Sequence, residues 1–197
     1  MTRGARPGGA AMGATLGALF LLAGAAAHAA WDVGALMQLL KAHPPGRARF
    51  NETKHVSILD RPLESSGELV FTPPDRLERR VTSPGNERMV ADRERLVVER
   101  GGRTQVLALA EHPEVALLIE SIRGTLAGDR EALERSYTLR LEGDERAWRL
   151  FLVPREASLA RLVKSVEIDG SQAQLQRVQV EQADGDSSLM QIRPGRP

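Results

Sequence analysis

The sequence predicts an α+β fold that is mainly β, and three observations lead to it. Apolar and polar residues alternate along many short segments, as they do in strands that place one face on a core. Short turn signals separate these segments, and strands joined by short turns pair in an antiparallel sheet. Two segments with a helical period, at residues 32–43 and 113–133, interrupt the strands.

The first 30 residues are typical of a secretory signal peptide. Arg3 and Arg6 precede an apolar run at residues 16–24, and the segment ends on Ala27-His28-Ala29-Ala30. The apolar run is shorter than the roughly 20 residues that span a bilayer. We therefore expect cleavage after Ala29 or Ala30 and release of one domain, residues 31–197, into the periplasm. No cysteine follows the small residues, so the protein itself is not expected to be lipidated.

The composition excludes several classes of function. The chain contains no cysteine, which excludes disulfide bonds, thiolate metal sites and a cysteine nucleophile. Removing Arg3 and Arg6 from the 27 basic residues leaves 25, against 26 acidic residues. Such a near-neutral chain lacks the basic excess of a nucleic-acid-binding domain. Aromatic residues make up only 4% of the chain, so its core must consist mainly of Leu, Val and Ile.

The first expected element after the leader is a helix over residues 32–43. Asp32 is its predicted N-cap, and Pro44-Pro45 ends it. Its buried face is marked by apolar residues at positions i, i+3, i+4 and i+7, namely Val33, Leu36, Met37 and Leu40.

From Ala48 onward the period changes to two, which predicts a series of strands. One strand carries Leu69 and Phe71 and ends at Pro73-Pro74, and the next carries Leu77 and Val81 on one face. Further strands are expected at residues 89–91, 96–99 and 104–110, with turns at 92–94 and 101–102 between them.

The helical period returns at Pro113, a residue suited to the first turn of a helix. The apolar stripe of this second helix consists of Val115, Leu118, Ile119, Ile122 and Leu126. Asp129 is the predicted cap of a further short helix that runs through Leu133.

Strands resume at Tyr137, where Leu139 and Leu141 continue the alternation. Hairpin turns are expected at residues 142–144, 169–170 and 184–185. The resulting meander either curls around the helices, whose apolar stripes then face its concave side, or forms a flat α+β sandwich.

The sequence contains no pattern that predicts catalysis or metal binding. His43, His55 and His112 are scattered without the spacing of metal ligands. Nucleophile elbows, phosphate-binding loops and dinucleotide-binding fingerprints are absent from the sequence. Ser65-Ser66-Gly67 has no obvious catalytic base and is typical of a turn, and the acidic residues alternate with arginines as they do on a solvated surface. We therefore expect no enzyme activity.

A series of segments, in a fixed order, is shared with a known family. The segments are Ala48–Thr53, Glu64–Pro74, Leu77–Pro84, Met89–Leu96, Leu150–Arg155, Val166–Gly170 and Val180–Ser188. With the helical insert between them, they resemble the LolA-type periplasmic carriers of outer-membrane lipoproteins, over residues 32–192. This resemblance implies a half-open antiparallel β-barrel that is closed by a helical lid, with a hydrophobic cavity that shelters acyl chains.

The resemblance and the strand alternation together predict which side chains line that cavity. They are Leu69, Phe71, Leu77, Val81, Met89, Leu96 and Val98 from the sheet, and Leu118, Ile119 and Ile122 from the lid. Each of these residues is equally compatible with plain core packing. The resemblance further implies a monomer that binds an acylated cargo, an inner-membrane release complex and an outer-membrane acceptor, without metal or organic cofactor and without nucleic acid.

Two positions depart from the family pattern. Pro73 stands where the family has an arginine that helps to hold the lid, and Arg79 stands where it has a tryptophan. The cavity of the family is also richer in aromatic residues. A carrier of another acylated molecule, such as a glycolipid or a pigment lipid, therefore remains an alternative, and so does a lipid-sensing or partner-binding protein without transport.

Overall fold

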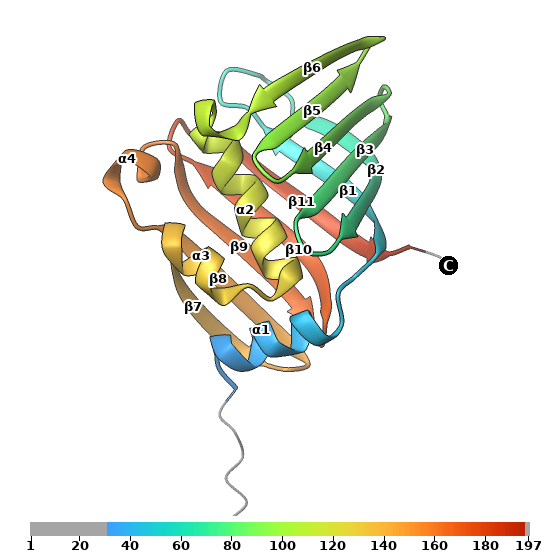
Figure 1. The fold of residues 1–197 in the computed structure, drawn as a ribbon. Coiled ribbons are helices and arrows are strands. Elements are labelled where there is room, and N and C mark those ends of the chain that lie inside the picture. The colour runs from blue at the N-terminus through green and yellow to red at the C-terminus, as the bar shows by residue number, and fades with distance from the viewer. Residues whose placement is uncertain (1–30, 196–197) are drawn as a thin grey trace, which may run out of the picture.

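The computed structural model describes residues 31–195, which form one antiparallel sheet wrapped around a group of helices (Figure 1). The expected signal peptide, residues 1–30, lies outside the described residues. The helices are α1 (Val33–Ala42), α2 (Pro113–Ala127), α3 (Arg130–Ser136) and α4 (Ala157–Ala160), with a 3-10 helix at Leu109–Glu111. The strands are β1 (Arg47–His55), β2 (Leu63–Thr72), β3 (Arg76–Ser83), β4 (Glu87–Asp92), β5 (Arg95–Arg100), β6 (Arg103–Ala108), β7 (Tyr137–Asp144), β8 (Ala147–Pro154), β9 (Val163–Ser171), β10 (Gln174–Gln182) and β11 (Ser187–Pro194).

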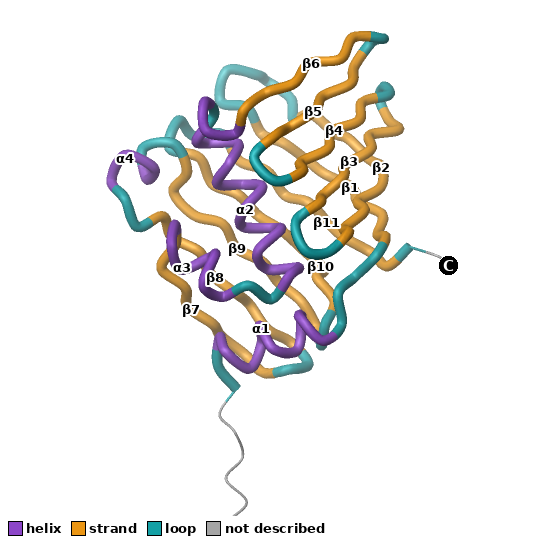
Figure 2. The backbone as a smooth tube through the Cα atoms, viewed as in Figure 1, coloured by secondary structure: helices purple, strands orange, loops and turns teal. Residues whose placement is uncertain are grey.

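The sheet is open, because its two outermost strands do not pair with each other. The strand order is β6-β5-β4-β3-β2-β1-β11-β10-β9-β8-β7, and every neighbouring pair is antiparallel. The chain runs from the centre to one edge, crosses through α2 and α3 to the other edge, and returns to the centre at β11. The sheet has two halves, β1–β6 and β7–β11. Figures 1 and 2 show these two halves curving around α2 and α3. This curved, half-open barrel confirms the predicted fold class, and the flat sandwich is excluded.

Capping residues start the helices where the sequence predicts. The Asp32 carboxylate accepts a hydrogen bond from the Ala35 amide at 2.8 Å, and the Asp129 carboxylate accepts one from the Ala132 amide at 2.9 Å. Gly128 ends α2 in the left-handed conformation, with φ of 62°. A Cβ atom at this glycine would lie 2.2 Å from the Met37 carbonyl oxygen, so glycine also permits the close packing of α1 against the end of α2.

The buried face of α2 coincides only in part with the apolar stripe that the sequence predicts, because Leu126 alone of the five predicted residues is buried. Within α2, Leu117, Ser121 and Thr125 are buried at helical spacing, whereas Leu118 and Ile122 are only half-buried. The small residues let α3 approach closely, because a Cβ atom at Gly124 would lie 2.7 Å from a methyl carbon of Leu133. The larger aliphatic side chains are thereby left to face the interior of the barrel.

Two of the predicted hairpin turns are wrong. Residues 142–144 and 169–170 lie within β7 and β9, and the turns follow at Glu145–Arg146 and Gln172–Ala173. Gly170 is required by close packing instead, since a Cβ atom there would lie 2.1 Å from the Trp148 ring. The third predicted turn is confirmed, because Gly185 joins β10 to β11 with φ of 94°.

The outer face of β3 carries a buried carboxylate among arginines, which corrects the expectation of a fully solvated surface. Glu78 is 6% exposed. It accepts hydrogen bonds from Arg88 Nε at 2.7 Å and from Arg80 Nε at 2.5 Å. The hydrogen bond from Arg88, followed by that from Arg80, outweighs desolvation and lowers the pKa of Glu78 to about 2.

We expect this carboxylate to make the fold sensitive to acid. Because folding lowers the pKa of Glu78 from 4.5 to about 2, its contribution is complete above pH 4.5 and is lost as the pH falls toward 2. Glu78→Gln should remove a contribution on the order of 2–3 kcal/mol at pH 7 and flatten the dependence of stability on pH between 4.5 and 2. Urea unfolding at a series of pH values measures both effects.

The matched control is Glu142→Gln, since the Glu142 side chain is 53% exposed and pairs with Arg140 on the edge strand β7. Its loss should change the stability by less than about 1 kcal/mol. If the stability of Glu78→Gln depends on pH between 4.5 and 2 as strongly as that of the natural sequence, the role assigned to the buried carboxylate is contradicted.

Candidate functional site

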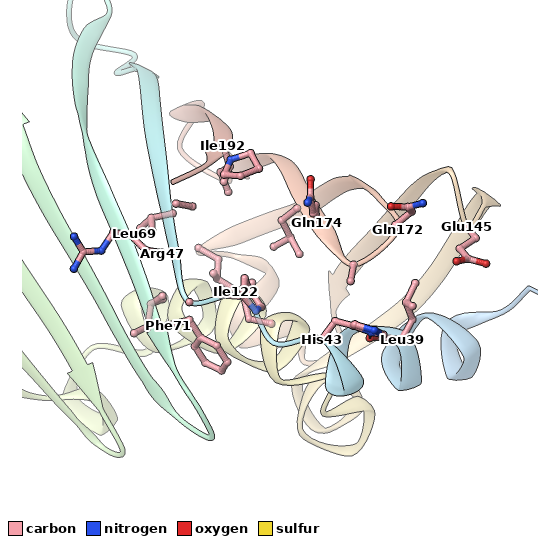
Figure 3. Close-up of a pocket in the computed structure, with 18 residues that line it drawn as sticks. Leu39, His43, Arg47, Leu69, Phe71, Ile122, Glu145, Gln172, Gln174 and Ile192 are labelled. Carbon is pink, nitrogen blue, oxygen red and sulfur yellow. The ribbon is translucent and has the colours of Figure 1, made fainter. Parts of the chain in front are cut away.

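An apolar cavity of about 550 Å³ lies where the two halves of the sheet meet the ends of α1 and α2 (Figure 3). Its volume falls within the range of roughly 300–1,000 Å³ that is usual for small-molecule sites. The aliphatic and aromatic side chains of its wall include Leu39, Ala48, Leu69, Phe71, Leu77, Ile122, Leu126, Leu175 and Ile192. They come from α1, α2, β1, β2, β3, β10 and β11, so the cavity exists only in the assembled fold.

Strand register explains why one side of the cavity is continuously apolar. Leu69 pairs with Ala48 across β1 and β2, and Phe71 pairs with Leu77 across β2 and β3. Paired residues place their side chains on the same face of a sheet. Leu69, Phe71 and Leu77 are 7%, 4% and 7% exposed, so they belong both to the core and to the cavity wall.

The mouth of the cavity is polar. Glu145, Gln172 and Gln174 stand on the β7–β8 and β9–β10 hairpins, and His43 stands at the end of α1 (Figure 3). The Arg47 guanidinium points away from the cavity in Figure 3 and lies 3.7 Å from the Glu68 carboxylate. The site thus combines an apolar interior with a rim of two amides, one carboxylate and one imidazole.

Residues 31–195 contain no group of three His, Asp or Glu side chains that could hold a metal ion. Within the same range, no helix is long and apolar enough to cross a membrane.

Helix α2 covers the interior and is attached to the two halves of the sheet by different interactions. On the β7 side, the buried Tyr137 hydroxyl donates a hydrogen bond to the Leu117 carbonyl at 2.7 Å. Desolvation raises the pKa of Tyr137 well above its ordinary value, so the hydroxyl keeps its proton and remains a donor. This side of α2 is held by dry packing and a buried hydrogen bond.

On the other side, α2 is attached through Arg123. Its Nη1 donates hydrogen bonds to the carbonyl oxygens of Arg93 at 3.0 Å and of Asp75 at 3.3 Å. These carbonyls belong to the β4–β5 and β2–β3 turns. Pro73, which replaces the arginine expected from the resemblance, begins the same β2–β3 turn. The cationic contact between helix and sheet is therefore made by a side chain of the helix.

A sequence model of the family described as "Outer membrane lipoprotein carrier protein LolA-like" matches residues 25–192. The chain belongs to this LolA-like family. Its members are carrier or binding proteins rather than enzymes. No curated protein matches the sequence.

Several solved structures are similar to this LolA-like chain in fold. A LolA superfamily protein from Nitrosomonas europaea is 11% identical, with a TM-score of 0.46, over 85% of this chain and 96% of that chain. A chain of the MucA/MucB complex of Pseudomonas aeruginosa is 16% identical, with a TM-score of 0.45, over 82% and 56%. The lipoprotein LppX of Mycobacterium tuberculosis is 9% identical, with a TM-score of 0.42, over 82% and 93%.

The ten predicted lining residues of the LolA-like cavity fall into three groups. Leu69, Phe71, Leu77 and Ile122 border the cavity. Val81 and Leu96 are buried in the core beside it. Met89, Val98, Leu118 and Ile119 are half-buried and pack against this core.

Other residues of the wall were not predicted. Ala48 and Ile192 follow the period-two alternation of their strands with Phe50 and Met190, which is a signal that could have identified them. Leu39 lies off the buried stripe of α1, and nothing in the sequence around it points to a cavity.

We expect Arg123 to control how firmly the C-terminal half of α2 is held. Arg123→Gln removes two charge-assisted hydrogen bonds to carbonyl groups, and because the site is partly exposed the loss should be about 1 kcal/mol. Amide hydrogen exchange in α2 should then be about fivefold faster, while exchange in β8 and β9 is unchanged. Arg135→Gln is the control, since Arg135 is exposed at the end of α3. Equal exchange rates in both variants would show that Arg123 does not hold α2.

Proposed function

We propose that this protein is a periplasmic carrier that shelters the acyl chains of lipoproteins during their transfer from the inner to the outer membrane. The observation that supports this proposal is the preformed cavity, which is lined by aliphatic side chains from both halves of the sheet and from α2. The signal peptide expected at residues 1–30 agrees with export to the periplasm.

The physical task of such a carrier explains the chemistry of the cavity. Each methylene group removed from water is worth roughly 0.8 kcal/mol, so an acyl anchor does not cross an aqueous compartment unaided. A carrier has to offer an environment that is comparably apolar. Ile122 and Leu126 of α2, together with Leu69 and Phe71 of β2, line the cavity and provide one.

Loading and release require the cavity to change its size. The two attachments of α2 suit a movement about the β7 side, where Tyr137 and Leu117 are buried, with separation on the side of Arg123. The hydrogen bonds of Arg123 are partly exposed to water, which can replace them at low cost. We infer that an inner-membrane release complex and an outer-membrane acceptor act on this side.

A second candidate function is the carriage of another acylated molecule, such as a glycolipid or a pigment lipid. It is favoured by Arg79, which stands in β3 where the resemblance places a tryptophan and makes part of the inner wall polar. A lipid-sensing or partner-binding protein that does not transport its ligand is the third candidate.

The test of acyl binding is Ile122→Glu. Ile122 lines the cavity and is half-buried, so a carboxylate there should place a charge against the bound chain without disrupting the core. We expect acyl ligands to bind at least about 100-fold more weakly, because a charge has no partner in an apolar cavity. Native mass spectrometry of protein purified gently from periplasm would detect the bound species and give its mass.

The matched control is Ile58→Glu, since Ile58 is 88% exposed in the β1–β2 connection. Retained acyl binding in a folded Ile122→Glu variant would rule out the cavity as the binding site. If acyl binding is established, rescue of cells depleted of their housekeeping lipoprotein carrier separates the candidates. Rescue supports lipoprotein transfer, whereas failure by a protein that carries another acylated species supports the second function.

A further inference from the structure

The inner face of the sheet is interrupted by a group of charged side chains. Arg79 Nη2 donates hydrogen bonds to Glu52 Oε2 at 2.5 Å and to Ser65 Oγ at 3.1 Å, and Arg79 Nη1 donates one to Glu87 Oε1 at 3.5 Å. Ser188 Oγ donates to the second oxygen of Glu52 at 2.6 Å. These five residues are named the Arg79 cluster.

Register places the cluster on the face that carries the cavity. Arg79 pairs with Leu69, which lines the cavity, and it lies between Leu77 and Val81 of the inner face. Glu52 follows Phe50 by two positions along β1, and residues two apart in a strand share a face. The cluster therefore stands on the inner wall.

The Arg79 side chain extends from the cavity wall over a buried ring to the acids beyond it. Its guanidinium lies 4.8 Å from the centre of the Phe50 ring, and Phe50 is 2% exposed. The Arg79, Glu52 and Glu87 side chains are 21%, 19% and 22% exposed. Arg79 lies beside Leu69 in the register, and its partners Glu52 and Ser65 lie two rows beyond Ala48 and Leu69, with Phe50 in the row between them.

An acyl chain long enough to extend along this wall beyond Leu69 meets the cluster. A methylene group cannot replace the hydrogen bonds of a carboxylate or a guanidinium. Covering the cluster with hydrocarbon would remove the remaining water from three charged groups. Each additional methylene therefore gains binding free energy only as far as the apolar wall reaches.

We propose that the Arg79 cluster ends the apolar cavity and sets the longest acyl chain that the protein accommodates. This inference rests on the proposed function, and it assigns to Arg79, Glu52 and Glu87 a role in cargo selection. A cluster that served stability alone would affect unfolding and leave the preference for chain length unchanged.

The experiment measures binding of monoacylglycerols from octanoyl to octadecanoyl by isothermal titration calorimetry. For the natural sequence, Kd should fall about fourfold with each methylene and then become constant once the chain reaches the cluster. The triple variant Arg79→Met/Glu52→Gln/Glu87→Gln should extend the apolar wall. The chain length beyond which Kd is constant should then increase by about two or more methylenes, because successive inner-face residues of a strand lie roughly 7 Å apart.

The control is Arg140→Met/Glu142→Gln, which removes an exposed ion pair on β7 away from the inner face. It should reproduce the chain-length dependence of the natural sequence. Circular dichroism establishes that each variant is folded. If the triple variant does not fold, Arg79→Met/Glu52→Gln takes its place, because Glu87 then keeps Arg100 at 3.7 Å.

Each outcome decides between the proposals. The inference is supported if, in either cluster variant, Kd becomes constant only at longer chains than in the natural sequence. The same chain-length dependence in a folded cluster variant and in the natural sequence overturns the inference and leaves the proposed function standing. An absence of binding at every chain length in the natural sequence overturns both.

Discussion

The edges of the sheet determine how the rest of the molecule is built. Strands β6 and β7 each pair on one side only, so hydrogen bonds between strands do not close the barrel. The inner face must be covered by other elements, and α1, α2 and α3 cover it (Figure 1). Helix α2 then needs two different faces. Ser121, Gly124 and Thr125 allow α2 to approach its neighbours closely, and Ile122 and Leu126 are left to line the interior. The cavity is a consequence of this division, since side chains that are not needed for helix packing remain free to line a space.

The two halves of the sheet carry out different tasks. Under α2 and α3, β8 and β9 form a conventional apolar core, in which Leu150, Leu152, Val166 and Ile168 are completely buried. The β2–β5 half is stabilised in part by ion pairs, with the Glu78 group outside and the Arg79 cluster inside. On the inner face, one half is apolar and the other contains the Arg79 cluster, although the outer face of β8–β10 also carries ion pairs. This difference between the two inner faces suits a protein whose interior opens on one side only.

The sequence was sufficient for the element order, the helix caps and the inner faces of most strands, because each of these depends on local chemistry. Asp32 and Asp129 cap helices through side chains three residues from the amides they bind, and alternation identified Leu69, Phe71 and Leu77. Long-range packing was not predictable in the same way. Gly170 was taken for a turn residue, although its role is to lie against Trp148. The cavity was predicted only in part for the same reason. Alternation shows which face of a strand is inward, but Leu39 and Leu175 border the space because two distant hairpins and a helix end meet there.

Strand β3 shows most clearly why charge pattern alone was misleading. Arg76, Glu78, Arg79 and Arg80 together have the composition of a solvated strand, yet Glu78 is buried on the outer face and Arg79 enters the inner one. The two adjacent residues have opposite environments because side chains alternate across the sheet. On the outer face, three arginines surround one acid, and the carboxylate remains ionised. On the inner face, two acids share one arginine beside Phe50. Since the arginine on the inner face is bound by its own acids, it is not free to bind an anionic group of a ligand. The inner wall therefore interacts with a cargo mainly through its apolar surface, and the Arg79 cluster marks where that surface ends.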